Sequence, residues 1–244
     1  MLILSDIHGN ADALKAVLEH AKSFDSVWVL GDLVDYGPEP HIVIDMIRDL
    51  KPEAIVMGNH DNAVAFNVDC GCAPETHDLS VYTRMNISFR FLSKEQIAWL
   101  RNLQVRVRLG IGSKKIYIVH ASPNKPLHGY IKPGMPSEML EQLLSEGTMA
   151  KKLVDADTLV VGHSHIPMDM VFKGIRILNP GSVGQPRDGD PRASYAILDT
   201  ETWSFSIYRV KYDVEAVIRK LEGLNLEPKY LKRLKSILLL GRVV

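Results

Sequence analysis

Aspartate, histidine and asparagine recur in short motifs at five separate places in the chain, most of them with glycine alongside. Carboxylate, amide and imidazole groups bind divalent metal ions, and a set rich in imidazole favours Mn, Fe, Zn, Co or Ni over Mg or Ca. If the fold brings the motifs together, they would support metal-dependent catalysis. The motifs are Asp6-Ile7-His8-Gly9-Asn10, Gly31-Asp32-Leu33-Val34-Asp35-Tyr36-Gly37, Gly58-Asn59-His60-Asp61, His120, and Gly162-His163-Ser164-His165.

Each motif lies at or just beyond the end of a short apolar run that has the length of a buried strand. The first runs alternate with amphipathic helical stretches, a pattern typical of an α/β fold with parallel strands. Ligands of such folds bind beyond the carboxyl ends of the strands, so all five motifs are expected at one rim. The elements in order are strand Leu2–Asp6, helix Ala11–Ala21, strand Ser26–Leu30, helix His41–Leu50 and strand Ala54–Met57.

The set of motifs is a stronger signal than any one member. An Asp-x-His or His-x-His pair occurs by chance, and a single buried histidine is more often a core residue than a ligand. Here five of the nine histidines share the same expected position after a strand. We therefore interpret the set as one metal site.

The rest of the chain predicts a helical insertion near residues 63–103, a hairpin of Val105–Leu109 with Lys115–His120, and further strands. Without a linker or boundary, we expect one domain over residues 1–244, with two sheets flanked by helices. A helix is predicted at Ser137–Leu153, and two more within Val214–Leu240, broken near Pro228. The further strands are Thr158–Gly162, Met168–Phe172, Ile175–Asn179, Tyr195–Asp199 and Ser204–Val210.

The composition argues against several classes of protein: nucleic-acid-binding, secreted, membrane-spanning and disulfide-rich proteins. Lys+Arg and Asp+Glu both total 29, and this balance argues against strong nucleic-acid binding. No secretory signal and no apolar run long enough for a membrane span are visible. Two cysteines are too few for a disulfide framework. A cytoplasmic location is expected.

In type and order, the five motifs resemble those of the calcineurin-like metallophosphoesterase superfamily, over roughly Met1–Tyr195. The later segment Gly181-Ser182-Val183-Gly184-Gln185-Pro186-Arg187 resembles a loop of its compact prokaryotic phosphodiesterase-like group. The resemblance implies a four-layer sandwich of two mixed β-sheets flanked by helices. It also implies hydrolysis of a small phosphorylated substrate by a hydroxide that bridges two metal ions.

The resemblance implies a role for each residue of the site. Two divalent ions against two carboxylates would leave the site about two charges positive, which attracts phosphate. Mn is the metal we expect first, with Fe, Zn, Co or Ni as alternatives. Asp6, His8 and His165 would hold one ion, Asn59, His120 and His163 the other, and Asp32 both. His60 would protonate the leaving group and Asp35 would orient it, although Asp35 could instead be a surface turn residue and Asp61 a helix N-cap.

Other residues keep two interpretations. Arg187 or Arg192 could bind a substrate phosphate, but a structural role is equally compatible with the sequence. Cys70 and Cys72 are best interpreted as ordinary thiols, with a redox or extra metal role as the alternative. Leu221–Leu240 could form a homo-oligomer interface or pack on the chain's own core.

Several functions fit the motifs. A phosphodiesterase or a nucleotide or dinucleoside-polyphosphate hydrolase is favoured, with a protein phosphatase as the alternative. Tyr36 stands where resemblance to Ser/Thr protein phosphatases and dinucleoside tetraphosphatases would lead one to expect Arg. That departure weakens the transfer of either substrate. A non-catalytic scaffold, like the retromer subunit of this fold, is less favoured because every expected ligand and His60 are present.

Overall fold

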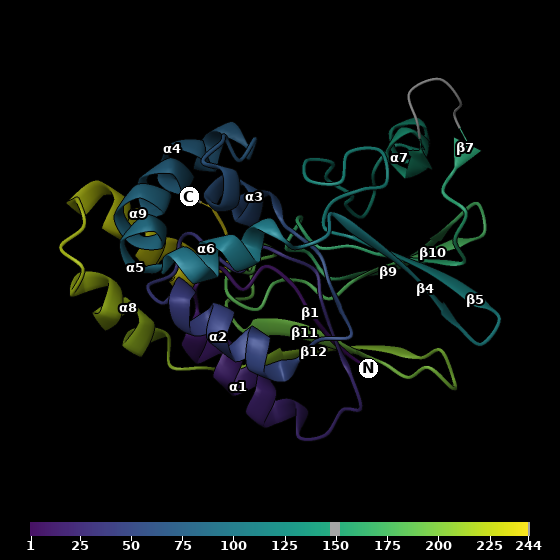
Figure 1. Ribbon diagram of the computed structural model, residues 1–244, viewed down its shortest axis with the longest axis horizontal. Helices are drawn as coiled ribbons and strands as arrows, with labels where there is room; N and C mark the ends of the chain where they lie inside the picture. The colour runs from purple at the N-terminus through teal and green to yellow at the C-terminus, as the bar shows by residue number, and fades with distance from the viewer. Residues whose placement is uncertain (147–151, 244) are drawn as a thin grey trace.

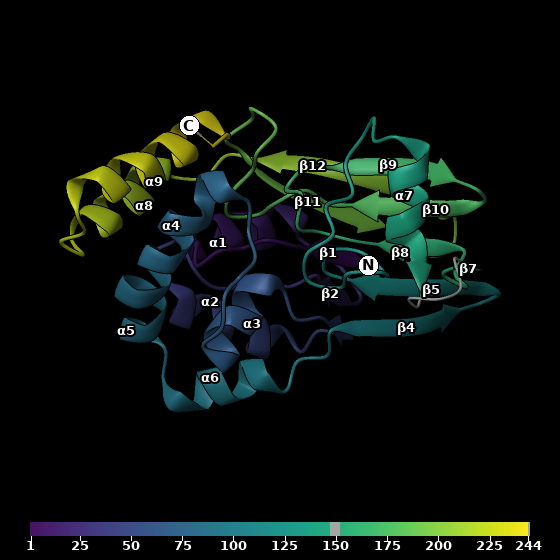
Figure 2. The ribbon, with the colours of Figure 1, turned by 90° about the horizontal axis from the view of Figure 1, so that it is seen from above.

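The computed structural model describes residues 1–146 and 152–243, which contain two stacked five-stranded β-sheets flanked by helices (Figures 1 and 2). The first sheet has the order β12-β11-β1-β2-β3 and the second β4-β5-β8-β10-β9. The first consists of β1 (Leu2–Leu4), β2 (Val27–Val29), β3 (Ala54–Ile55), β11 (Ala193–Leu198) and β12 (Phe205–Val210). The second consists of β4 (Arg106–Ile111), β5 (Lys114–Val119), β8 (Thr158–Val160), β9 (Met168–Phe172) and β10 (Ile175–Asn179).

Alternation of side chains along the strands produces the layers. In β1, Ile3 faces the second sheet and packs near Trp28 and Ile118, whereas Leu2 and Leu4 face the helices. Helices α1 (Ala11–Ala21) and α2 (Pro40–Leu50) cover the outer face of the first sheet, and α7 (Ser137–Leu144) covers that of the second. Both sheets mix parallel and antiparallel pairs. The expected sandwich of two mixed sheets is confirmed.

The remaining helices gather at one end of the sandwich, to the left in Figures 1 and 2. The helical insertion predicted near residues 63–103 is confirmed, although its first helix begins earlier, at Asn59. Leu221, Leu234 and Ile237 pack against Tyr36 and Leu79 of the same chain. The helices are α3 (Asn59–Phe66), α4 (Pro74–Thr83), π-helix η1 (Arg84–Ser88), α5 (Phe89–Phe91), α6 (Lys94–Arg101), α8 (Val214–Glu222) and α9 (Pro228–Leu240).

The predicted helix Ser137–Leu153 is wrong beyond Leu144. The backbone at Ser145 is extended, and β6 (Ser145–Glu146) pairs with β7 (Lys152–Leu153) in antiparallel fashion. The apolar periodicity that predicts the helix ends with Leu144, because the next residues are polar. Residues 147–151 of that prediction lie outside the described part of the chain. Within the described ranges, no helix is long and apolar enough to cross a membrane.

Candidate metal centre

The proposed metal ligands lie just past the carboxyl ends of five strands, as expected from the sequence. Strand β1 leads to Asp6 and His8, β2 to Asp32, β3 to Asn59, β5 to His120, and β8 to His163 and His165. All seven side chains are buried, with at most 3% of their surface exposed. The loops lie so close together that a Cβ atom on Gly58 would stand 2.1 Å from Asp32 Oδ1. Glycine is therefore required beside the carboxylate shared by the two ligand sets.

The ligand atoms form two clusters that share Asp32. Asp6, His8, Asp32 and His165 form the first, with their ligand atoms within 4.8 Å of one another. Asp32, His120 and His163 form the second by the same measure. Asn59 Oδ1 lies 3.1 Å from His120 Nε2, so the amide joins the second cluster. The structure thus brings together all seven residues that the sequence singled out as metal ligands.

Backbone carbonyls orient three of the imidazole rings. Nδ1 of His8, His120 and His165 lies 2.9, 2.6 and 2.5 Å from the carbonyl oxygens of Val34, Leu30 and Gln185 respectively. In a neutral ring, Nδ1 must donate to the carbonyl, so Nε2 carries a lone pair that can bind a metal.

Those lone pairs face carboxylate oxygens. His165 Nε2 lies 3.2 Å from Asp6 Oδ1, and His120 Nε2 lies 3.3 Å from Asp32 Oδ2. Asp6 Oδ1, Asp32 Oδ2 and His163 Nε2 are buried without a hydrogen-bond partner among the described residues. Buried polar atoms are normally paired, and acceptors facing one another require a cation or a proton between them. The donor set therefore fits divalent metal ions.

The pKa values of the proposed ligands in the folded protein support the same conclusion. Burial lowers the pKa of His8 to about 3 and those of His163 and His165 well below the ordinary value, which keeps all three neutral. Burial raises the pKa of Asp6 to about 7. Burial would lower that of His120, but the charges of Asp32 and Asp6 and the hydrogen bond to the Leu30 carbonyl together outweigh burial and raise the pKa to about 9. The positive charge that this pocket favours is the charge that a metal ion would supply.

His60 lies beside the ligands and forms a buried pair with Asp35. Its Nδ1 donates to Asp35 Oδ2 at 2.9 Å, and its ring lies edge-on to His8 with centroids 5.0 Å apart. Burial alone would lower the pKa of His60, but the charges of Asp32 and Asp35 outweigh it and raise the pKa. Asp35 is fully buried, so the alternative of a surface turn residue is wrong.

Two further partners of Asp35 come from η1, and sequence reasoning missed them. Ser88 Oγ donates to Asp35 Oδ1 at 2.7 Å, and Arg84 Nε donates to Asp35 Oδ2 at 3.3 Å. A π-helical turn is rare and often occurs at functional sites; here it supplies both residues.

The alternative that Asp61 is the N-cap of α3 is wrong, because Gly58 holds that position and Asp61 is the third residue of the helix. Its carboxylate accepts from the backbone N–H groups of Gly58 (2.9 Å), Asp32 (2.8 Å) and Leu33 (2.8 Å). It thereby joins the start of α3 to the turn that carries Asp32.

Comparison with known proteins agrees with this geometry. Residues 1–203 match the family model of the calcineurin-like phosphoesterase superfamily domain. The chain belongs to this superfamily. The chain is 31% identical to the uncharacterized protein MJ0912 of Methanocaldococcus jannaschii over 90% of each chain. It is 25% identical to phosphodiesterase YfcE of Escherichia coli, covering 84% of this chain and 89% of that one. The crystal structure of a metallophosphoesterase from Sphaerobacter thermophilus covers 96% of both chains at 31% identity, with a TM-score of 0.76.

An open cleft of about 620 Å³ adjoins the ligand cluster. Tyr130 lines it and stacks on His163, with ring centroids 4.0 Å apart. Arg187, Lys132 and Arg242 also line the cleft. Arg192 does not belong to its lining and instead forms an ion pair with Asp190 at 2.6 Å. The structure therefore brings Arg187 toward the site and leaves Arg192 away from it.

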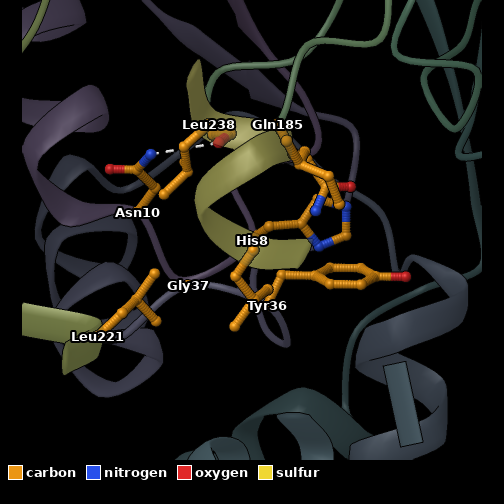
Figure 3. A pocket seen from close by; sticks show the side chains of 10 residues that line it. His8, Asn10, Tyr36, Gly37, Gln185, Leu221 and Leu238 are labelled. Atoms are coloured by element: carbon orange, nitrogen blue, oxygen red, sulfur yellow. Dashed lines mark hydrogen bonds between the residues drawn. The ribbon is translucent and has the colours of Figure 1, made fainter. Parts of the chain in front are cut away.

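A second, much smaller cavity lies behind His8. Figure 3 shows His8, Tyr36 and Gln185 around it, with Leu221 and Leu238 contributed by α8 and α9. Its free volume of about 10 Å³ has room for about one water molecule. The cleft on the Tyr130 side, with about 620 Å³, is by contrast large enough for a small molecule.

Proposed function

We propose that the chain is a cytoplasmic, single-domain phosphohydrolase that cleaves phosphate mono- or diesters with two divalent metal ions. A phosphodiesterase or a hydrolase of nucleotides or dinucleoside polyphosphates is favoured. The observation that carries the proposal is the pair of buried, unpartnered carboxylate oxygens, Asp6 Oδ1 and Asp32 Oδ2, faced by imidazole Nε2 atoms.

The ligands divide between two ions. Asp6, His8 and His165 would hold one and Asn59, His120 and His163 the other, while Asp32 would bind both. When bound, the two ions would lower the pKa of a water molecule and neutralise charge on the phosphoryl oxygens. Manganese is the metal that we expect first, with Fe, Zn, Co or Ni as alternatives, because an imidazole-rich donor set favours these metals over Mg or Ca.

His60 is the proposed general acid. Its Nδ1 is held by Asp35, so Nε2 is the ring atom left to give a proton to the leaving oxygen. The raised pKa favours the protonated form of His60, as this role requires. Arg84 and Ser88 hold Asp35 in place and act as positioning residues.

The cleft supports a substrate that extends beyond one phosphate. Lys132, Arg187 and Arg242 line it together with a single acidic residue, Glu75. In the described part of the chain, none of these three cations lies within ion-pair distance of a carboxylate. Their charges remain available to an anionic substrate such as a diester or a polyphosphate. The name of the YfcE relative, a phosphodiesterase, supports the same class.

The test is hydrolysis of bis-p-nitrophenyl phosphate and p-nitrophenyl phosphate by metal-stripped protein reloaded with Mn²⁺. We expect turnover that depends on Mn²⁺ and is faster with the diester. A faster rate with the monoester would replace the diesterase assignment by a phosphatase. Protein that binds no metal would contradict the proposal and favour the scaffold function.

A further inference from the structure

Two cysteine thiols lie beside His60, outside the seven proposed ligands. They are the only cysteines of the sequence, and both belong to the segment between α3 and α4. A ring nitrogen of His60 and the sulfur atoms of Cys70 and Cys72 lie within 4.8 Å of one another. Both thiols are free; Cys70 is buried and Cys72 is half-buried. Two sulfurs and one imidazole nitrogen are therefore gathered in one place.

The backbone holds this segment in position. Gly71 adopts a left-handed conformation between the two cysteines, and its N–H donates to Asp69 Oδ1 at 2.6 Å. A Cβ atom on Gly71 would stand 2.9 Å from His128 Nδ1. The carbonyl of Cys70 accepts from Asn59 Nδ2 at 2.9 Å. The thiols are thus tied to the start of α3, the helix that also carries His60.

The spacing of these atoms suits a tetrahedral metal ion. Three atoms no more than 4.8 Å apart leave a central ion at most about 2.8 Å from each. A Zn–S bond of about 2.3 Å then needs each ligand to move by roughly 0.5 Å. Sulfur ligands select zinc and other thiophilic ions over Mn²⁺ or Mg²⁺. The chemistry therefore differs from that of the neighbouring cluster, whose donors are nitrogen and oxygen.

We propose that His60, Cys70 and Cys72 form a separate site for one thiophilic divalent cation such as Zn²⁺, Cd²⁺ or Co²⁺. Binding would release the two thiol protons and the imidazolium proton of His60 to solvent, and form two metal–sulfur bonds and one metal–nitrogen bond. Ser80 Oγ lies 3.4 Å from Cys70 Sγ and 3.2 Å from His60 Nδ1, and so links the imidazole to the thiol. An ion in this site would hold His60 away from proton transfer and inhibit hydrolysis; this consequence rests on the proposed function, whereas the binding does not.

The experiment is a titration of reduced, metal-free protein with Co²⁺ under anaerobic conditions, followed by absorption. Because the cluster around Asp32 has no sulfur donor, sulfur-to-cobalt charge-transfer absorption in the near ultraviolet reports the thiol site alone. We expect this absorption in the native protein and its loss in Cys72→Ser. In His60→Ala the affinity should fall at least about 10-fold, since even loss of a ligand's hydrogen-bonding partner costs about 10–100-fold.

His77→Ala is the matched control. His77 belongs to a different nearby group with Asp69 and Cys70, which lacks Cys72. The absorption should therefore survive in His77→Ala. Its loss there, or its persistence in Cys72→Ser, would assign the metal to that other group and overturn the proposal.

A second measurement follows the reactivity of the thiols instead of cobalt absorption. Zn²⁺ should protect both thiols of the native protein from reaction with a disulfide reagent, with one ion more bound per chain than in Cys72→Ser. Thiols that react equally fast with and without Zn²⁺ would refute the site, even if the protein hydrolyses phosphate esters as proposed.

Discussion

Replacing Asp35 by Asn tests how the general acid is held. Asp35 Oδ2 accepts from His60 Nδ1 at 2.9 Å in a fully buried position. Asn keeps the shape of the side chain but removes one of the two negative charges, those of Asp32 and Asp35, that raise the pKa of His60. With that charge gone, the pKa of His60 falls, so the imidazole loses its proton at a lower pH. The alkaline limb of the pH–rate profile should therefore move to lower pH.

The size of the rate loss follows from the role of the proton. General acid catalysis contributes about 10²–10⁴-fold. His60 remains in Asp35→Asn, so we expect a loss near the lower end, about 100-fold, for a diester with an alkyl leaving group. Nitrophenolate leaves without protonation, so bis-p-nitrophenyl phosphate should lose much less.

The stability cost comes from Arg84, whose side chain is 6% exposed. Removing one partner of a buried ion pair costs about 3–5 kcal/mol. Arg84 keeps its hydrogen bonds to Val68 O (3.0 Å) and Ser80 Oγ (3.2 Å), so we expect about 3 kcal/mol. Urea unfolding measures this loss, and the double variant Asp35→Asn/Arg84→Met should recover part of it because it removes the unpaired charge.

Two results would refute the assignment. One is an alkaline limb that stays in place in Asp35→Asn. The other is an equal loss of rate for the alkyl and nitrophenyl diesters, because a group that only shapes the site affects both substrates alike.

Four further variants test other parts of the site. Asp32→Asn should abolish hydrolysis and lower the metal content, measured by elemental analysis. A variant with full metal content and full rate would contradict the assignment of Asp32 to the metal centre. His60→Ala should keep its metals and lose about 10²–10⁴-fold in kcat for alkyl diesters but little for nitrophenyl esters; equal losses would exclude the acid role. Asp61→Ala leaves three buried N–H groups without acceptors, at about 1–3 kcal/mol each. Its free energy of unfolding should fall by at least about 3 kcal/mol, and an unchanged urea midpoint would contradict this. Arg187→Ala should raise KM for the diester about 10-fold, as expected for a charged hydrogen bond, whereas Arg192→Ala should leave KM unchanged; equal effects would remove Arg187 from the substrate site.

The positions of the seven proposed metal ligands were predictable because their signal is local. Asp6, Asp32 and His120 each follow an apolar run closely, and parallel strands necessarily bring such positions to one edge. The sandwich itself was expected from the family resemblance of the same motifs. The helix predicted at Ser137–Leu153 failed beyond Leu144, since pairing between β6 and β7 depends on a partner strand that periodicity does not reveal.

The support around Asp35 was not predictable. Arg84 and Ser88 lie 49 and 53 residues further along the chain, in a helical region without a distinctive pattern. Their approach depends on a π-helical turn, which no periodicity in the sequence indicated. Arg187 and Arg192 were equivalent in the sequence for a similar reason. The ion pair of Arg192 with Asp190 and the place of Arg187 in the cleft distinguish the two residues, and both are properties of the folded chain.

Seven residues at this rim share a left-handed backbone conformation that is unfavourable for side chains other than glycine. Each costs on the order of 1 kcal/mol, and the sum is a large fraction of an ordinary domain's stability. Ions that bind the native state alone would offset that strain by mass action. The survival of the protein in a cell that degrades unfolded chains would then follow its metal supply, so metal starvation would deplete the protein itself as well as its activity. The residues are Asp6, His8, Asp32, Asp35, Tyr36, His163 and His165.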